Sequence, residues 1–366
     1  MNKILNLDNN IDIVAIEPLN NKQDKILEVN WFMHRRCNFD CSYCPPYIHD
    51  NFSKVISFEQ VVKTLTVFSK KLKDIGKDKI NWALTGGEPL INPDIIKILK
   101  YIRNDEITKK IIVTSNGSRN YEKLKEIMFY LDNLTISLHL EKGLDHNFKL
   151  IEKIDKLTND YQNKFITFTI VVPAGFLEDV KKIKIMLEQK NLKHSFRAIK
   201  PTFDYDLNLI KSGHKWFKNK ENVEIDKNFS NLVNTKRFQE NKKFRLEYYS
   251  KEENDFLIST ERVHDFHNMI FFTRNKNSHK IHSDHLYANY MSKFKGWLCF
   301  GGIDHCAIRE NGDVWRTICQ NASPLGNINT DFSFVDAPMI CQKETCVALP
   351  DITCRKNQPG FEQLVK

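Results

Sequence analysis

Segments rich in β-branched and aromatic residues alternate with segments of helical spacing along the first 200 residues of the chain. Six short apolar runs have the character of strands; they are 26–33, 80–85, 111–115, 134–140, 165–172 and 194–199. Five segments between them carry apolar residues three and four positions apart, as amphipathic helices do; they are 61–72, 94–102, 121–131, 148–157 and 177–189. The alternation predicts an α/β protein whose parallel sheet is covered by helices, with ligand sites at the carboxyl ends of the strands. An open sheet and a barrel both fit this pattern.

The alternation stops near residue 200, and this change predicts the division into domains. Residues 201–295 mix short apolar patches with charge, which is typical of a linker and variable substrate-facing insertion. Residues 296–366 contain Asn311-Gly312 between two alternating stretches, a strong signal for a β-hairpin. We therefore expect a large domain over 1–200, an insertion over 201–295 and a small C-terminal domain over 296–366.

Cysteines occur at the two ends of the chain only. Of the nine, three lie at 37–44 and six at 299–354. No segment is apolar for long enough to act as a signal peptide or membrane span, so we expect a soluble, cytoplasmic protein without a membrane partner. The cytosol keeps disulfides rare, and the cysteines are therefore expected to bind metal.

The formal net charge of +9 adds little to this picture. The chain's 55 basic residues are scattered among 46 acidic ones. This distribution is typical of an ordinary solvated surface, and it does not favour nucleic acid as a partner.

Cys37, Cys41 and Cys44 have the spacing C-x3-C-x2-C. Three thiolates can hold a four-iron, four-sulfur cluster by three of its irons and leave the fourth iron open to an outside ligand. The alternative is a zinc site completed by His34 or His49, within a basic module that contacts nucleic acid. Zinc sites usually use C-x2-C or C-x4-C pairs, so this alternative fits the spacing poorly.

The segment CNFDCSYC, followed by LTGGEPLINP, resembles the radical S-adenosylmethionine (SAM) superfamily. The resemblance implies an enzyme with a partial (β/α)6 TIM-like barrel, which the six predicted strands permit. It implies that Cys37, Cys41 and Cys44 ligate a [4Fe-4S] cluster and that SAM chelates the open iron. One electron then cleaves SAM to methionine and a 5′-deoxyadenosyl radical, and an electron donor such as flavodoxin or ferredoxin is implied as a partner.

The same resemblance assigns further residues to SAM. Gly86, Gly87 and Glu88 directly follow the strand at 80–85; glycines let backbone approach a ligand closely, and a carboxylate can offset the SAM ammonium. Strand-end residues would contact the ribose and carboxylate of SAM; they are Thr114, Ser115, Asn116, Ser137 and His139. Tyr43 would lie near the adenine and Val171 would pack on its other side. Each strand-end residue also fits a turn, a helix cap or a satisfied interior histidine, and Val171 fits plain core burial.

The C-terminal cysteines resemble the auxiliary-cluster domain called twitch, a short form of the SPASM domain. The resemblance implies one auxiliary [4Fe-4S] cluster with four ligands, since six cysteines are too few for two fully ligated clusters; the ligands are Cys299, Cys319, Cys341 and Cys346. Cys306 falls inside a strand of the hairpin, where a free cysteine packs as a small apolar residue. Whether Cys354 replaces a ligand or is idle stays open.

These expectations combine into one hypothesis. The protein would be a radical SAM enzyme that abstracts hydrogen from an unactivated carbon of a peptide or small metabolite. The auxiliary cluster would transfer an electron or position the substrate. The identity of the substrate and the outcome of the reaction stay open.

Overall fold

The computed structural model describes most of the chain. It covers residues 11–19, 25–41, 44, 49–173, 175–198, 250–260, 268–283, 286, 291–343, 345–346 and 348–365. Tyr43 and most of the predicted insertion at 201–295 lie outside these residues. Within the described part, no helix combines the length and the apolar character that crossing a bilayer requires.

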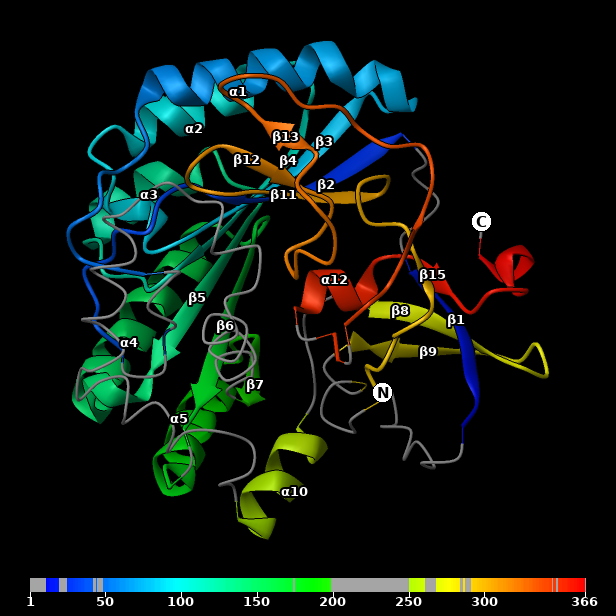
Figure 1. Ribbon diagram of the computed structural model, residues 1–366. Coiled ribbons are helices and arrows are strands. Elements are labelled where there is room, and N and C mark those ends of the chain that lie inside the picture. Colours follow the sequence, from blue (N-terminus) through cyan, green and yellow to red (C-terminus); the bar gives the residue numbers. More distant parts are fainter. Residues whose placement is uncertain are drawn as a thin grey trace.

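The six predicted strands form six neighbouring parallel strands in chain order, as Figure 1 shows. They are β2 (Ile26–Phe32), β3 (Lys79–Thr85), β4 (Thr108–Ser115), β5 (Asn133–His139), β6 (Phe165–Val172) and β7 (His194–Ala198). The predicted α/β fold with a partial barrel is thereby confirmed. The strand order is linear, from β13 at one edge to β7 at the other, so the barrel is open.

Helices cover the outer face of the parallel sheet and supply the apolar stripes that the periodicity predicted (Figure 1). They are α1 (Phe58–Lys71), α2 (Ile95–Asn104), α3 (Tyr121–Met128), α4 (Leu144–Asp160) and α5 (Leu177–Gln189). Burial of this face is the main stabilising contribution; Trp82 of β3, for example, packs edge-on against Phe68 of α1 with ring centroids 5.6 Å apart. After the undescribed segment, α10 (Lys251–Ser259) packs Phe256 against Phe196 of β7.

The predicted hairpin at Asn311-Gly312 is also confirmed. It joins β11 (His305–Ile308) to β12 (Asp313–Trp315), and Gly312 has a φ of +86°, which favours glycine. The hairpin does not stand apart from the barrel. β11 runs parallel to β2, and β12 continues to β13 (Gly326–Asn327), so the hairpin lengthens the barrel sheet. Hydrogen bonds therefore cross the boundary that we predicted near residue 295.

A second, antiparallel sheet joins the start of the described chain to its end. Its strands, in spatial order, are β14 (Met339–Ile340), β10 (Leu298–Cys299), β15 (Lys356–Asn357), β1 (Ile13–Pro18), β8 (Asn268–Thr273) and β9 (Ser278–His282). The short helix α12 (Leu349–Thr353) contacts β1, and its Asp351 bonds His305 of β11 at 3.1 Å. Helix α12 therefore links the two sheets (Figure 1).

Candidate active site

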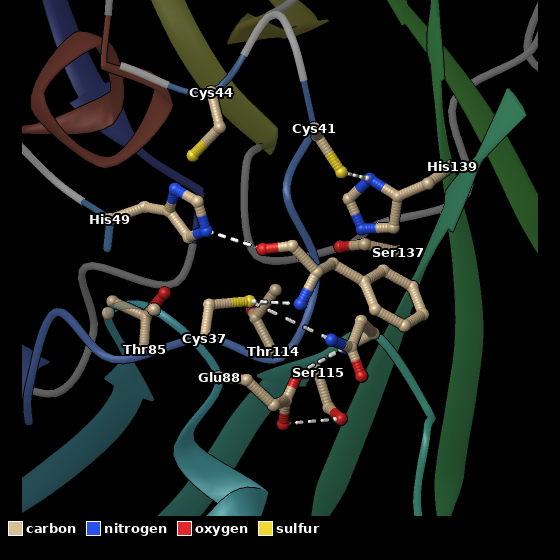
Figure 2. Close-up of a pocket in the computed structure, with 14 residues that line it drawn as sticks. Cys37, Cys41, Cys44, His49, Thr85, Glu88, Thr114, Ser115, Ser137 and His139 are labelled. Carbon is tan, nitrogen blue, oxygen red and sulfur yellow. Dashed lines mark hydrogen bonds between the residues drawn. The ribbon is translucent and has the colours of Figure 1, made fainter. Parts of the chain in front are cut away.

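A cavity of about 250 Å³ lies at the carboxyl ends of strands β3, β4 and β5. It brings together almost all residues that the sequence assigned to the first cluster and to SAM; these are Cys37, Cys41, Cys44, Gly86, Gly87, Glu88, Thr114, Ser115, Asn116, Ser137 and His139. Three further lining residues were not predicted for this site: Phe39, His49 and Thr85. Figure 2 shows that these side chains come from the loop after β2 and from the ends of the next three strands.

The loop that carries the three cysteines is closed at its base by an ion pair. Arg35 lies 2.7 Å from the carboxylate of Asp50, whose side chain is almost fully buried. The backbone N–H of Cys37 donates to the Asp50 carbonyl at 2.7 Å. Burial opposes the ionisation of Asp50, but hydrogen bonds from Ser53 and the Arg35 charge outweigh burial and lower its pKa. These contacts therefore join the two ends of the loop.

The three sulfurs border one shared space, which is what a cluster bound by three thiolates requires. The Cys37 sulfur accepts a hydrogen bond from the backbone N–H of Phe39 at 3.4 Å and lies 3.9 Å from the Asn116 side-chain nitrogen. The Cys41 sulfur is 3.2 Å from Nδ1 of His139 (Figure 2). Burial raises the pKa of the Cys37 thiol, and these hydrogen bonds offset part of that rise, so they favour the thiolate form that binds iron. The donor set therefore fits a [4Fe-4S] cluster.

The two glycines after β3 are required by the backbone of the cysteine loop. A Cβ on Gly86 would meet the His34 carbonyl oxygen at 2.3 Å, and a Cβ on Gly87 would meet the Arg36 carbonyl oxygen at 2.2 Å. The backbone N–H of Gly87 donates to His34 and that of Glu88 donates to Arg36, at 2.7 and 2.9 Å. We expected these glycines to make room for SAM. The structure shows that they first make room for residues 34–36, and thereby set the cysteine loop against the turn.

Glu88 is buried at the centre of the site, with 1 % of its surface exposed. Its carboxylate accepts hydrogen bonds from Ser115 Oγ at 2.8 Å and from the backbone N–H of Asn116 at 2.6 Å (Figure 2). Burial raises the pKa of Glu88 to about 7, because these bonds only partly offset the loss of hydration. A cationic or N–H-donating ligand at this position would restore the ionised form.

We expect SAM binding to weaken as the pH falls below about 7, the pKa of Glu88. Below this pH the carboxyl is protonated, so binding the SAM amino group requires release of a proton. The affinity should fall roughly tenfold per pH unit. The measurement is equilibrium dialysis of SAM against the reconstituted protein across pH. Glu88→Gln should bind SAM weakly at every pH; an unchanged pH dependence in this variant would assign the titration to another group.

Of the remaining predicted SAM residues, some line the cavity and others do not. Burial lowers the pKa of His139 to about 4, so its imidazole is neutral at neutral pH and can bond the Cys41 sulfur. Val171 is the register partner of His139 on β6, but it is not among the residues that line the cavity. Tyr43 lies outside the described residues. Its assignment to adenine stays a prediction.

The residues that sequence analysis missed had weak local signals. Thr85 directly precedes Gly86 and was counted as the last residue of a strand, although strand ends form the site. Phe39 lies between the first two cysteines, and its ring packs edge-on against His139 with centroids 5.5 Å apart. His49, considered only as a zinc ligand, bonds the Phe39 carbonyl.

Five of the six C-terminal cysteines gather in one place, which we call the C-terminal cysteine cluster; it comprises Cys299, Cys319, Cys341, Cys346 and Cys354. The Cys299 and Cys354 thiols form a hydrogen bond that lowers the pKa of Cys299 and raises that of Cys354. The other three thiols interact electrostatically with Cys299. The four predicted auxiliary ligands therefore lie together, and Cys354 lies with them.

The Asp351 side chain of α12 binds the backbone of the segment that carries Cys319. Asp351, 1 % exposed, accepts hydrogen bonds from the backbone N–H of Ile318 at 2.9 Å and of Cys319 at 2.6 Å. Burial opposes ionisation of Asp351, but its bonds to His305 and to these N–H groups lower its pKa overall. The pKa of Lys356 is raised above its ordinary value. Burial by itself would lower this pKa, but the negative charges of Cys299 and Cys354 outweigh the effect of burial.

Cys306 lies apart from this cluster. It is the register partner of Val29 and is fully buried among the apolar residues of the barrel. Burial alone raises its pKa. Within the described part of the chain, no group of three or more His, Cys, Asp or Glu side chains is arranged to hold a single metal ion.

The comparisons with known proteins agree with the first site. Residues 31–145, which contain the three cysteines and the Gly-Gly-Glu turn, match the model of the Radical SAM superfamily. GTP 3′,8-cyclase of Aquifex aeolicus is 30% identical over 169 residues, which are 44% of this chain and 48% of that protein. GTP 3′,8-cyclase of Limosilactobacillus fermentum is 33% identical over 180 residues, 48% of this chain and 50% of that protein. This chain spans about half the length of these curated relatives.

A solved structure described as tagged anSMEcpe with bound AdoMet covers 84% of this chain and 76% of its own, with 15% identity and a TM-score of 0.45. Radical SAM domains use a [4Fe-4S] cluster together with SAM, and the cavity carries the thiols and polar groups for both. Residues 31–145 of this chain therefore form a radical SAM domain.

Proposed function

We propose that this protein cleaves SAM reductively in the cavity at the ends of β3, β4 and β5 and abstracts a hydrogen atom from an unactivated carbon of its substrate. When bound, the cluster supplies one electron that breaks the S–C5′ bond of SAM into methionine and a 5′-deoxyadenosyl radical. The observation that carries the proposal is the convergence of three thiols, the Gly-Gly-Glu turn and the strand-end polar groups on one cavity.

The chain's own residues have distinct tasks in this proposal. Cys37, Cys41 and Cys44 hold the cluster, and the Arg35–Asp50 ion pair fixes the loop that carries them. Glu88 receives the amino group of SAM. Ser115 and the Asn116 N–H keep the Glu88 carboxylate aimed at the cavity, through the hydrogen bonds described above.

We further propose that the C-terminal cysteine cluster holds one auxiliary [4Fe-4S] cluster. Four of its thiols suffice to close all four irons, and five are present. The twitch resemblance favours Cys299, Cys319, Cys341 and Cys346. The hydrogen bond between Cys299 and Cys354 supports a place for Cys354 beside the cluster as well. Reduced thiols at both sites agree with the expected cytoplasmic location.

We propose a small molecule, in preference to a peptide, as the substrate. The curated relatives are named for a reaction on GTP. These relatives match about half of the chain, so this name supports a small-molecule substrate without naming it. A flavodoxin or ferredoxin would serve as the electron donor.

The test of this function needs no known substrate. The protein is reconstituted anaerobically with iron and sulfide and given SAM and dithionite, and 5′-deoxyadenosine is measured. Formation of 5′-deoxyadenosine is expected, and its absence from a fully iron-loaded protein would contradict the proposal. Candidate substrates, GTP and peptides alike, are then ranked by how much they increase 5′-deoxyadenosine formation.

Two matched cysteine substitutions test the auxiliary cluster. Cys319→Ser should lose about half of the iron, the share of one four-iron cluster in two. Cys306→Ser should keep all of it, because Cys306 lies in the barrel core. The iron and sulfide content of both variants is the measurement that tests the auxiliary ligands. Iron loss in Cys306→Ser with normal iron in Cys319→Ser would overturn the assignment, and Cys306→Ala controls for the cost of a buried hydroxyl.

A further inference from the structure

A lysine side chain is buried beside the C-terminal cysteine cluster. Lys356 lies on β15 and is 1 % exposed. It is the register partner of Cys299 on the antiparallel strand β10. Register partners project to the same face of a sheet, so the ammonium and the Cys299 thiol share one side. Cys354, whose thiol bonds Cys299, is two residues away along the chain.

The direct partners of this ammonium are neutral. Its Nζ donates to the carbonyl oxygens of Asp351, Ile352 at 3.2 Å and Cys354 at 2.7 Å. Among the described residues, no carboxylate oxygen lies within the 4.0 Å of an ion pair with Lys356. The carboxylate of Asp351 is engaged by His305 and by the N–H groups of the segment at 318–319.

A buried ammonium without an ionic partner is costly, and lysine is almost never fully buried unless it is paired. Three carbonyl dipoles and the ring of Phe294, whose centroid lies 5.0 Å from Nζ, offset part of the charge and leave the rest to a nearby anion. Four groups that can carry a negative charge act on the ammonium: the thiols of Cys299, Cys354 and Cys346 more strongly, and the Asp351 carboxylate, which is bonded to other donors, less so. Four thiolates on a cubane core of charge 2+ leave a net charge of about −2. Such a group supplies the anion that this lysine lacks.

We propose that Lys356 is the built-in counter-charge of the auxiliary cluster and raises its reduction potential. This inference rests on the proposed presence of that cluster. Reduction of the core by one electron adds one negative charge beside the ammonium, so a fixed positive charge favours the reduced form. The cluster thereby becomes a better electron acceptor. Lys356 is a positioning residue for charge and does not touch the substrate.

The experiment measures the potential of the auxiliary cluster by itself. All variants are made in the full-length protein that carries alanine at positions 37, 41 and 44, so that only the C-terminal site takes up iron. The reconstituted cluster is titrated with dithionite and followed by electron paramagnetic resonance and visible absorption. Lys356→Gln keeps hydrogen-bond donors and removes the charge, whereas Lys356→Arg keeps the charge. Lys123→Gln, on the exposed surface of α3, makes the same charge change far from the cluster.

We expect Lys356→Gln to shift the midpoint to a more negative potential with its iron content unchanged. Lys356→Arg and Lys123→Gln should stay close to the parent protein. If the glutamine variant takes up no iron while the arginine variant does, the charge is needed to bind an anionic cluster, which also supports the proposal.

Two outcomes would overturn it: an unchanged midpoint in a fully loaded Lys356→Gln, or loss of iron from the arginine and glutamine variants alike, which would make side-chain shape decisive. Failure of the underlying function has a different signature. The protein that keeps Cys37, Cys41 and Cys44 would then bind the iron of one cluster only, whatever residue stands at 356.

Discussion

Replacing Cys37, Cys41 and Cys44 together by alanine is expected to abolish SAM cleavage and to leave about half of the iron, the share of one cluster in two. The three thiols border the active cavity, and the auxiliary site has its own thiols around α12. Cleavage requires an open iron that binds SAM, and no other group of the described site replaces it. The measurements are 5′-deoxyadenosine after anaerobic reconstitution, and iron and sulfide per chain.

The control is the Cys306→Ser variant, which removes one buried thiol and should keep both activity and iron. A triple variant that still forms 5′-deoxyadenosine would refute the assignment of the first site. A triple variant that retains no iron would show that the C-terminal site assembles only when the first cluster is present. Circular dichroism of the variant distinguishes such coupling from loss of the fold.

A single methyl group at Gly87 should remove the cluster from the first site as well as SAM. The added Cβ would lie 2.2 Å from the Arg36 carbonyl oxygen and 2.3 Å from that of Arg35. Both oxygens belong to backbone, which cannot rotate away as a side chain does. The cysteine loop must therefore shift, and Gly87→Ala is expected to lose about half of the iron together with most SAM binding. Iron analysis and equilibrium dialysis of SAM test this.

Gly143→Ala is the matched control. Nothing lies within 4 Å of a Cβ at that position, but its φ of +83° and ψ of 160° belong to a region that is nearly confined to glycine, so the substitution costs about 1–3 kcal/mol. This variant should keep both clusters and bind SAM normally. If Gly87→Ala keeps all its iron and loses only SAM, the glycine makes room for the ligand, as the sequence suggested, and the contact with residues 34–36 is unimportant.

The sequence predicted the parallel strands and their helices well because the signals for both are local. A buried parallel strand is a short apolar run, and its helix carries an apolar stripe, so six strands and five helices could be located without knowing what they pack against. The cysteine triplet and the Gly-Gly-Glu turn were found in the same way. Each is a short stretch whose chemistry depends on residue type and spacing, and each falls at the end of a predicted strand.

The contacts around these motifs were not predictable from local pattern. Arg35 and Asp50 are two ordinary charged residues in the sequence, and only the closed loop makes them an ion pair. The contact of Gly87 with the backbone at 34–36 was not predicted, since the two segments approach each other only in three dimensions. Charge pairing and close approach depend on distance in space, which the pattern of apolar and polar positions does not encode.

The sequence pattern was therefore enough to locate the parallel strands, the three cysteines that border the cavity and a second group of cysteines. The tertiary structure decided that β11 pairs with β2, that β1 pairs with β15, and that Cys354 joins Cys299 while Cys306 enters the barrel core. A two-residue strand such as β15 has no periodicity of its own, so its partners are fixed only by burial of the whole sheet. The burial of Lys356 follows from that pairing, and with it the charge beside the C-terminal cysteine cluster.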